Sequence, residues 1–131
     1  MSRPIQVTCA LIQKKGLLLL ARRADSGRWE LPGGKREPGE SLAQCLEREI
    51  AEELGCTVEV LKPAGVAQDL ERPDPINLHC FVCRLSGAEP QAREHKELRW
   101  VSLKEALELD LCPADRELLS QFVSRANVAM I

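Results

Sequence analysis

Residues 34–56 read GKREPGESLAQCLEREIAEELGC, a glycine- and proline-rich turn that leads into an amphipathic helix pattern. Ser41 with Gln44 three residues later is a capping-box signature, and leucine and isoleucine then recur at four-residue spacing. Gly55 stands where a glycine commonly ends a helix. The sequence therefore predicts a helix over residues 41–54.

Short apolar runs on both sides of this helix are typical of strands. Apolar residues alternate over residues 5–11 and cluster at 17–21, which predicts a hairpin of two strands. Residues 24–40 are rich in glycine, proline and charge and are expected to form a loop. Further strands are expected over residues 57–61, 66–70, 76–85 and 98–101.

The C-terminal segment carries a second helix pattern, which begins at Pro113. Its buried stripe is expected to contain Leu118, Leu119, Phe122, Val123 and Ala126. Mixed strands with two substantial helices predict an α/β layered fold. A chain of 131 residues is expected to form a single domain over residues 1–131.

The composition excludes several classes of protein. A formal net charge of −2 argues against a binder of nucleic-acid polymers or anionic membranes. No run approaches the roughly 20 apolar residues that cross a bilayer, so we expect a cytoplasmic protein. The six cysteines are then interpreted as small buried apolar side chains. The small net charge results from two segments of opposite charge. Residues 1–28 carry six basic and one acidic side chain, whereas residues 29–53 carry three basic and seven acidic side chains.

Three glutamates, Glu49, Glu52 and Glu53, lie within two turns of the predicted helix. Like charges at this spacing cost about 0.2–0.5 kcal/mol per pair unless something compensates them. Carboxylate oxygens suit Mg²⁺ or Mn²⁺, which would compensate the repulsion. A solvated acidic helix face with Arg48 as partner explains the same residues. The residues alone leave both interpretations open.

The whole stretch from Gly34 to Cys56 resembles the Nudix box, and every fixed identity of that motif is present. The one departure is Cys56, where the family usually has an aliphatic residue. The preceding strand pair and residues 31–35 also resemble MutT-like members. This resemblance implies a Nudix α/β/α sandwich, an α/β fold with a mixed sheet between helices. It also implies a hydrolase that cleaves a nucleoside diphosphate linked to another group.

The resemblance further implies a Mg²⁺ site, with Mn²⁺ as a possible substitute. Its ligands would be Glu49, Glu52, Glu53 and the carbonyl of Gly33. The general base differs among family members, so Glu52 and Glu53 are the first candidates and Glu94 is the second. Arg48 would orient the carboxylates by ion pairing, and Glu40 would support the loop.

The expected substrate contacts lie mostly outside the metal site. Arg23, at the end of a strand, and Lys35 are expected to contact phosphates beside Gly34. Leu78 shares one face of its strand with Ile76 and Cys80 and is expected to line the nucleobase side. Trp29 and Phe81 are the candidates for stacking on a base, and packing in the core is the alternative for both.

Asp115 follows Cys-Pro-Ala, a segment that resembles CTP pyrophosphohydrolases and other triphosphate enzymes of the family. An ionised carboxylate accepts but does not donate hydrogen bonds, which favours a base edge with an amino group, such as N4 of cytosine. The same residue is equally explained as an acid in the first turn of a helix, stabilised by the helix dipole. Both interpretations stay open.

Together these features predict a Mg²⁺-dependent hydrolase of nucleoside triphosphates that releases the monophosphate and pyrophosphate. CTP or a modified deoxynucleotide such as 8-oxo-dGTP is the expected substrate. The alternatives are a hydrolase of ADP-ribose or another nucleoside diphosphate derivative, to which Pro73 gives weak support, and an inactive nucleotide-binding module. No nucleic-acid polymer or membrane partner is expected, and the protein would be a monomer or homodimer.

Overall fold

The computed structural model describes residues 3–70 and 72–130, with side chains up to Ser124. Within these residues seven strands and three helices follow one another along the chain. In order they are β1 (Ile5–Lys14), β2 (Leu17–Arg22), β3 (Trp29–Glu30), β4 (Gly33–Lys35), α1 (Leu42–Leu54), β5 (Thr57–Asp69), β6 (Ile76–Ser86), β7 (Glu97–Val101), α2 (Leu103–Glu108) and α3 (Pro113–Met130).

The strands form one mixed sheet with β1 at its centre. The strand order is β3-β2-β1-β6-β5, with β4 paired to β1 and β7 paired to β2. β1 runs parallel to β6, and the other pairs are antiparallel. The parallel pairing brings Leu78 beside Val7 and Cys80 beside Cys9.

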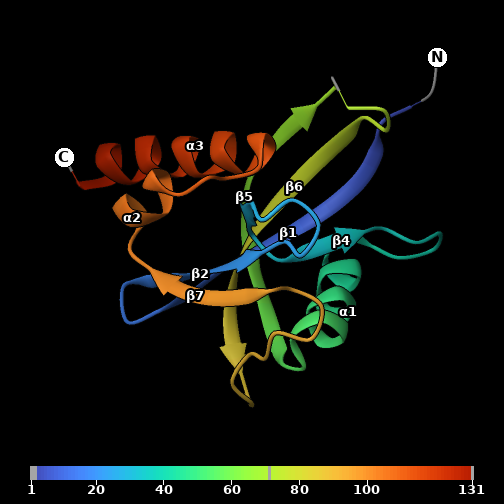
Figure 1. Cartoon of the computed structure of the whole chain (residues 1–131), viewed down its shortest axis with the longest axis horizontal. Coiled ribbons are helices and arrows are strands. Elements are labelled where there is room, and N and C mark those ends of the chain that lie inside the picture. The colour runs from blue at the N-terminus through green and yellow to red at the C-terminus, as the bar shows by residue number, and fades with distance from the viewer. Residues whose placement is uncertain (1–2, 71, 131) are drawn as a thin grey trace.

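Helices cover both faces of this sheet, with α1 on one face and α3 on the other (Figure 1). Side chains alternate across β1, since Cys9 and Leu11 belong to the apolar cluster that includes α3, whereas Ala10 and Ile12 belong to the one that includes α1. An apolar strand buried on both faces is what a sheet between two helical layers requires. The expected α/β/α sandwich is confirmed.

The predicted first helix is present, with Ser41 as its N-cap and α1 beginning at Leu42. The Ser41 hydroxyl accepts a hydrogen bond from the backbone of Gln44, and the Gln44 side chain accepts one from the backbone of Ser41. Gly55 ends the helix with φ of 63°, a left-handed conformation in which a side chain would be strained. The local signals therefore determined both ends of this element.

Residues 24–40 were expected to form a loop, and this prediction was incomplete. The segment contains β3 and β4, and β4 pairs with β1 so that Gly34 lies opposite Thr8. Glycine has a low propensity for strands, so the sequence of Gly33 and Gly34 does not predict one. Their extended backbone conformation follows from the pairing with β1. This pairing places the Gly33–Lys35 strand next to the start of α1.

Residues 57–70 were expected to form two strands, but they form the single strand β5. Its pairing with β6 shifts register between Val60 and Lys62 and between Pro63 and Gly65. Pro63 has no N–H group to donate to the hydrogen bonds between β5 and β6. The shifts in register interrupt the alternation of side chains, so the sequence pattern suggests two strands where there is one. The short helix α2 was also not predicted.

The buried stripe of α3 is present in the part of the chain whose side chains are described. Leu118 and Leu119 are buried, Phe122 packs against the same apolar cluster, and Val123 is partly exposed. Ala126 lies beyond the described side chains. In the described part of the chain, no helix has the length and apolar character needed to span a membrane.

Candidate functional site

The cavity that gathers most of the candidate residues, called the main cavity below, has a volume of about 480 Å³. It lies between the β4–α1 region, the β5–β6 connection and the start of α3. Its lining combines carboxylates, cationic side chains and an apolar part. The lining residues are Val7, Thr8, Arg23, Glu30, Leu31, Gly33, Gly34, Lys35, Glu49, Glu53, Asp69, Arg72, Ile76, Leu78, Cys112, Pro113, Ala114 and Asp115.

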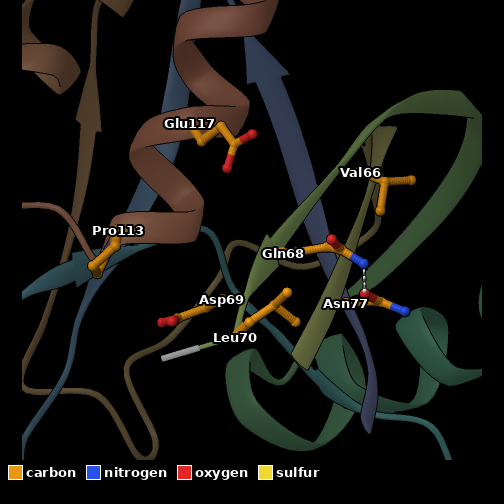
Figure 2. A pocket seen from close by; sticks show the side chains of 7 residues that line it. All are labelled: Val66, Gln68, Asp69, Leu70, Asn77, Pro113 and Glu117. Atoms are coloured by element: carbon orange, nitrogen blue, oxygen red, sulfur yellow. Dashed lines mark hydrogen bonds between the residues drawn. The ribbon is translucent and has the colours of Figure 1, made fainter. Parts of the chain in front are cut away.

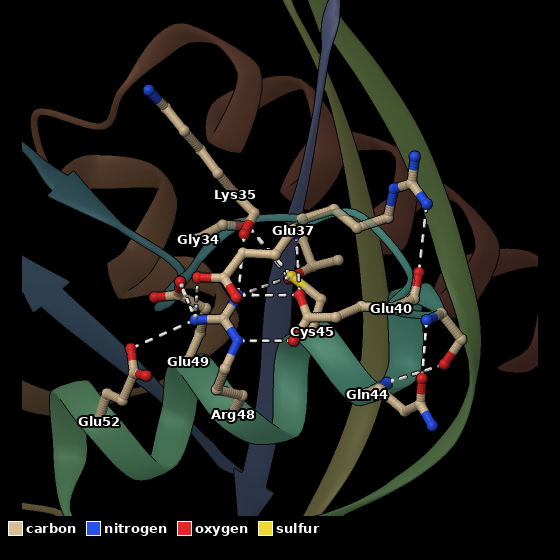
Figure 3. Close-up of polar contacts among 12 residues, drawn as sticks. Gly34, Lys35, Glu37, Glu40, Gln44, Cys45, Arg48, Glu49 and Glu52 are labelled. Atoms are coloured by element: carbon tan, nitrogen blue, oxygen red, sulfur yellow. Dashed lines mark hydrogen bonds and ion pairs between the residues drawn. The ribbon is translucent and has the colours of Figure 1, made fainter.

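Arg48 organises the acidic side of α1. Its Nε and Nη2 donate to the two carboxylate oxygens of Glu40, at 2.6 and 2.9 Å. Its Nη1 donates to Glu49 at 2.8 Å and to Glu52 at 3.3 Å, and Figure 3 shows the guanidinium among these carboxylates. The hydrogen bonds from Arg48 lower the pKa of Glu40 to about 2. Arg48 therefore ties the loop before α1 to the helix and holds Glu49.

Gly34 lies directly against the carboxylate of Glu49. A Cβ at Gly34 would come within 2.3 Å of Glu49 Cδ, so the glycine leaves the space that this carboxylate occupies. The carbonyl of Gly34 accepts hydrogen bonds from Thr8 Oγ1 at 3.3 Å and from Cys45 Sγ at 3.6 Å. The β1–β4 pairing and the missing side chain together set the position of Glu49 at the main cavity.

Glu53 lies in the wall between the main cavity and a smaller one, called the second cavity, of about 300 Å³. The second cavity is lined by Arg23, Ala24, Asp25, Glu30, Glu53, Glu94 and His95. Burial raises the pKa of Glu53 to about 8, against the opposing charge of His95. Among the described side chains, the buried polar atoms without a hydrogen-bond partner are Glu53 Oε2 and His95 Nδ1.

The residues of α1 and β4 fit a divalent cation of the Mg²⁺ type. An unpartnered buried carboxylate oxygen at Glu53, with Glu49 on the same cavity, offers the hard oxygen atoms that such an ion prefers. The described residues contain no group of three or more acidic, histidine or cysteine side chains arranged to hold a metal. Mg²⁺ commonly takes one or two protein carboxylates and completes its shell with water and phosphate oxygens.

Glu52 is separated from the other two glutamates. Its side chain is 58% exposed and contacts Arg48, and it does not line the main or the second cavity. The expectation that all three glutamates share one cluster is therefore not met in this arrangement. Glu53 is four residues after Glu49 and so lies nearly above it on the helix, whereas Glu52 is one residue before Glu53 and points about 100° away from it around the helix axis.

Arg23 is more strongly paired than the sequence indicated. Its Nε and Nη2 donate to Asp25 at 2.9 and 2.8 Å, and its Nη1 donates to Glu30 at 3.0 Å. These hydrogen bonds and charges raise the pKa of Arg23, which stays cationic. Arg22 does not line either cavity, since its side chain donates to the Gly27 carbonyl.

Glu30 and His95 are the site residues that sequence reasoning missed. His95 Nε2 contacts Glu30 Oε2 at 2.9 Å, and the other Glu30 oxygen accepts from Arg23. Burial lowers the pKa of His95, but the hydrogen bond and charge of Glu30 outweigh burial and raise it. The two residues are 65 positions apart, and only the pairing of β2 with β3 and β7 brings them together.

The other expected contacts are divided between the cavities. Lys35 is exposed at the rim of the main cavity, and Glu94 is exposed at the second cavity. Leu78 lines the apolar part of the main cavity with Val7 and Ile76. Gly33 and Gly34 line it through β4. The fold therefore places acidic, cationic and apolar groups around one space.

Neither of the expected stacking residues reaches the main cavity. Trp29 is packed in the core, with the Arg99 guanidinium 4.7 Å from its ring centroid. Phe81 packs against the apolar cluster of α1, because it is an odd number of residues from Leu78 and Cys80 and points to the opposite face of β6. Of the two interpretations of these rings, packing in the core describes their position, and stacking on a base in the main cavity does not.

Asp115 lies in the first turn of α3 and also lines the main cavity, so both interpretations of this residue describe its position. Its Oδ1 accepts a hydrogen bond from the backbone of Leu31 at 2.8 Å. Burial raises the pKa of Asp115 to about 7, although the Leu31 hydrogen bond opposes this. The expectation of a permanently ionised acceptor is therefore incomplete, because the protonated form, which can also donate, is populated near neutral pH.

This pKa predicts a pH-dependent stability. The native carboxyl binds its proton more tightly than the unfolded one, whose ordinary pKa is 3.8, so the contribution of Asp115 is present below pH 3.8 and is lost as pH rises to about 7. We expect the free energy of unfolding to fall by roughly 1 kcal/mol per pH unit across this window through Asp115. Urea unfolding between pH 5 and 7 should show a steeper fall in the wild type than in Asp115→Asn, which keeps the contribution of Glu53, whose pKa is also raised. Equal slopes in the two proteins would contradict the assignment.

An outer pocket of about 700 Å³ adjoins the main cavity and shares Asp69 and Pro113 with it. Figure 2 shows this pocket, in which the Gln68 side chain donates a hydrogen bond to Asn77 at 2.8 Å. Val66 on β5 and Leu70, which follows the end of β5, also line the pocket. The other lining residue is Glu117 of α3. The main cavity therefore opens outward between β5 and α3.

Comparisons with known proteins agree with this geometry. Residues 2–122 match the family model of the NUDIX domain. CTP pyrophosphohydrolase of Escherichia coli K12 is 40% identical over 124 residues, which cover 92% of this chain and 92% of that protein. Putative 8-oxo-dGTP diphosphatase 2 of Mycobacterium tuberculosis is 40% identical over 103 residues, 78% of this chain and 73% of that protein. The solution structure of the E. coli ORF135 protein has a TM-score of 0.82 at 37% identity and covers 96% of this chain and 93% of that chain.

Proposed function

Because this chain belongs to the NUDIX family and is a hydrolase of nucleotide phosphoanhydrides, we propose that it converts nucleoside triphosphates to the monophosphate and pyrophosphate. The observation that carries the proposal is the composition of the main cavity. It has Glu49 and Glu53 on one side, Arg23 and Lys35 beside them, and an apolar part around Leu78. A metal-bound polyphosphate attached to a base is the ligand class that needs all three.

Members of this family typically depend on a divalent metal ion. In this chain Glu49, Glu53 and the carbonyl of Gly33 would hold Mg²⁺ or Mn²⁺, with Glu52 as an outer carboxylate. When bound, the ion neutralises phosphate oxygens and makes water easier to deprotonate. Arg48 holds Glu49 in place at 2.8 Å.

Glu53 is our choice as the general base. Its Oε2 is buried and free of hydrogen bonds to other described residues, so it is available to take a proton. Burial raises the pKa of Glu53 to about 8 without a bound ion, and a bound cation would lower it and favour the carboxylate form that accepts a proton. Glu52 is more exposed, and Glu94 lies at the rim of the second cavity, so both rank below Glu53.

The phosphates would lie along β4, because Lys35 and the backbone of Gly34 line the main cavity there and Arg23 lines the same cavity. Lys35 supplies a mobile charge at the rim, and Arg23 supplies the N–H groups that Asp25 and Glu30 leave unused. The basic N-terminal segment thereby complements the acidic segment that contains α1.

The base would lie against Leu78 and beside Asp115. As an ionised group Asp115 accepts a hydrogen bond from an exocyclic amine, such as N4 of cytosine, and as a protonated group it also donates. We therefore propose CTP or a modified deoxynucleotide such as 8-oxo-dGTP as the substrate, which agrees with the names of the two relatives. Pro73, which suggested ADP-ribose, does not line the main cavity.

A panel of nucleotides tests the proposal. The protein is incubated with CTP, dCTP, the other ribonucleotides, 8-oxo-dGTP and ADP-ribose in Mg²⁺, and the products are separated by anion exchange. We expect a monophosphate and pyrophosphate in equal amounts from CTP or a modified deoxynucleotide. Activity on ADP-ribose alone would identify a nucleoside diphosphate hydrolase, and tight nucleotide binding without turnover would identify an inactive module. Either result would overturn the proposal.

A further inference from the structure

Two side chains at the wall between the main and second cavities, Glu30 and His95, have no role in the catalytic proposal. Three residues line both cavities: Arg23, Glu30 and Glu53. His95 lines only the second cavity and reaches this wall from behind, through its contact with Glu30. Each carboxylate oxygen of Glu30 thus has one partner, Arg23 on Oε1 and His95 on Oε2.

His95 is held firmly where it meets Glu30. Its side chain is only 7% exposed. The segment that carries it is tied to two elements, because Gln91 N donates to the Leu54 carbonyl at the end of α1 and Lys96 N donates to the Arg22 carbonyl at the end of β2, both at 2.8 Å. An imidazole fixed in this way is a rigid donor to Glu30, unlike a side chain on a free loop.

The two carboxylates that hold Arg23 differ in burial. Asp25 is 66% exposed, and both of its oxygens bind one edge of the guanidinium, through Nε and Nη2. Glu30 is 17% exposed and is the counter-charge on the cavity wall. Glu30 binds the remaining nitrogen, Nη1, from the cavity wall, and the three hydrogen bonds together leave two of the five N–H groups of Arg23 for a ligand.

We propose that His95 and Glu30 are positioning residues that present Arg23 to the phosphates of the substrate. By occupying Oε2, His95 prevents Glu30 from binding Arg23 through both oxygens, the arrangement that arginine and carboxylate otherwise prefer. Arg23 then keeps its remaining N–H groups on the main cavity. This inference rests on the proposed function, because it assumes that phosphates bind beside Arg23.

Removal of the His95 donor tests the inference by steady-state kinetics on the best substrate of the panel. We expect His95→Ala to raise KM about tenfold, because binding of the phosphates is weakened. We expect a smaller change in kcat, which arises because the charge of His95 also lowers the pKa of Glu53. His95→Gln, whose amide can still donate to Glu30, should restore most of the wild-type KM. If His95→Ala does not fold, His95→Phe replaces it, since the ring keeps the volume and removes the donor.

A double-mutant cycle separates positioning from simple structural support. In an Arg23→Ala background His95→Ala should change KM less than twofold, because there is no guanidinium left to position. The same fold-change in both backgrounds, or a loss confined to kcat, would overturn the inference. His79→Ala is the matched control: His79 is a half-buried histidine that contacts Gln6, lines neither cavity, and should leave KM unchanged.

A spectroscopic measurement keeps this inference separate from the proposed function. In low-temperature ¹H–¹⁵N spectra of the free protein, the resonance of Arg23 Nη1–H, which donates to Glu30, should shift in His95→Ala and return toward its wild-type position in His95→Gln. An unchanged resonance would disprove the positioning role even if the enzyme is active. A shifted resonance in a protein without triphosphatase activity would contradict the proposed function alone.

Discussion

Glu53→Gln is expected to lower kcat about 10³-fold without unfolding the protein. The substitution removes the charge and the proton-accepting ability of the carboxylate that borders both cavities. Stability should be preserved because burial already disfavours the charged form, which is why the pKa of Glu53 is raised to about 8. The measurements are steady-state kinetics in Mg²⁺ and thermal unfolding of the same samples.

Two other glutamates of α1 serve as comparisons for this variant. Glu47 is exposed and lines neither cavity, so Glu47→Gln should keep wild-type kinetics. Glu52→Gln removes an exposed partner of Arg48 and should reduce activity far less than Glu53→Gln. A Glu53→Gln protein with unchanged kinetics would refute both the metal role and the base role of Glu53. A larger loss in Glu52→Gln would exchange the two assignments.

Gly34→Ala should abolish most activity while costing little stability. The added Cβ would lie 2.3 Å from Glu49 Cδ and 2.4 Å from its Oε2, so the carboxylate must move away from the main cavity. The atoms that move are the end of a flexible side chain, and the backbone has no clash to relieve. We expect a loss of about 10²-fold or more in kcat/KM, with a melting temperature close to that of the wild type.

Gly33→Ala provides the contrast, because its Cβ would lie 2.0 Å from the backbone carbonyl of Thr8. That atom belongs to the central strand β1, so the β1–β4 pairing must open. We expect a destabilisation of about 3 kcal/mol, measured by urea unfolding. Gly34→Ala should thus mainly lower activity, whereas Gly33→Ala should mainly lower the free energy of unfolding. Equal stability losses in both variants would show that Glu49 is part of a rigid packing contact instead.

The local sequence was sufficient wherever an element carries its own start and stop signals. The ends of α1 follow from the Ser41 capping box and the left-handed Gly55, and its buried face follows from aliphatic residues at helical spacing. The layered arrangement follows from the apolar runs of β1 and β2, which are buried on both sides. These signals act over a few residues and do not depend on the rest of the fold.

The elements that the sequence pattern missed are those whose backbone is determined by distant partners. β4 consists of Gly33–Lys35 and is extended because it pairs with β1, which lies more than twenty residues earlier. The interruption in β5 follows from two register shifts against β6. Neither a pairing partner nor a bulge leaves a periodic signal in the strand itself.

The candidate site divides in the same way. The Nudix box identified Glu49, Glu53 and Arg48 by their spacing on one helix, where geometry follows from the helical repeat. Spacing did not separate the exposed Glu52 from the other glutamates, nor reveal that Trp29 and Phe81 pack away from the main cavity. Orientation across a packed interface depends on which neighbour fills each space, and a one-dimensional pattern does not contain that information.

The sequence by itself determined the family, the helix that carries the acidic residues, and the cationic segment that complements it. Only the tertiary structure decided that Glu30 joins Arg23 to His95, because these residues meet through strand pairing and not through proximity in the chain. It also decided the acidity of Asp115, since burial of this side chain beside Leu31 raises its pKa to about 7. The underlying reason is that charge and contact energies depend on three-dimensional burial, which residue types alone do not specify.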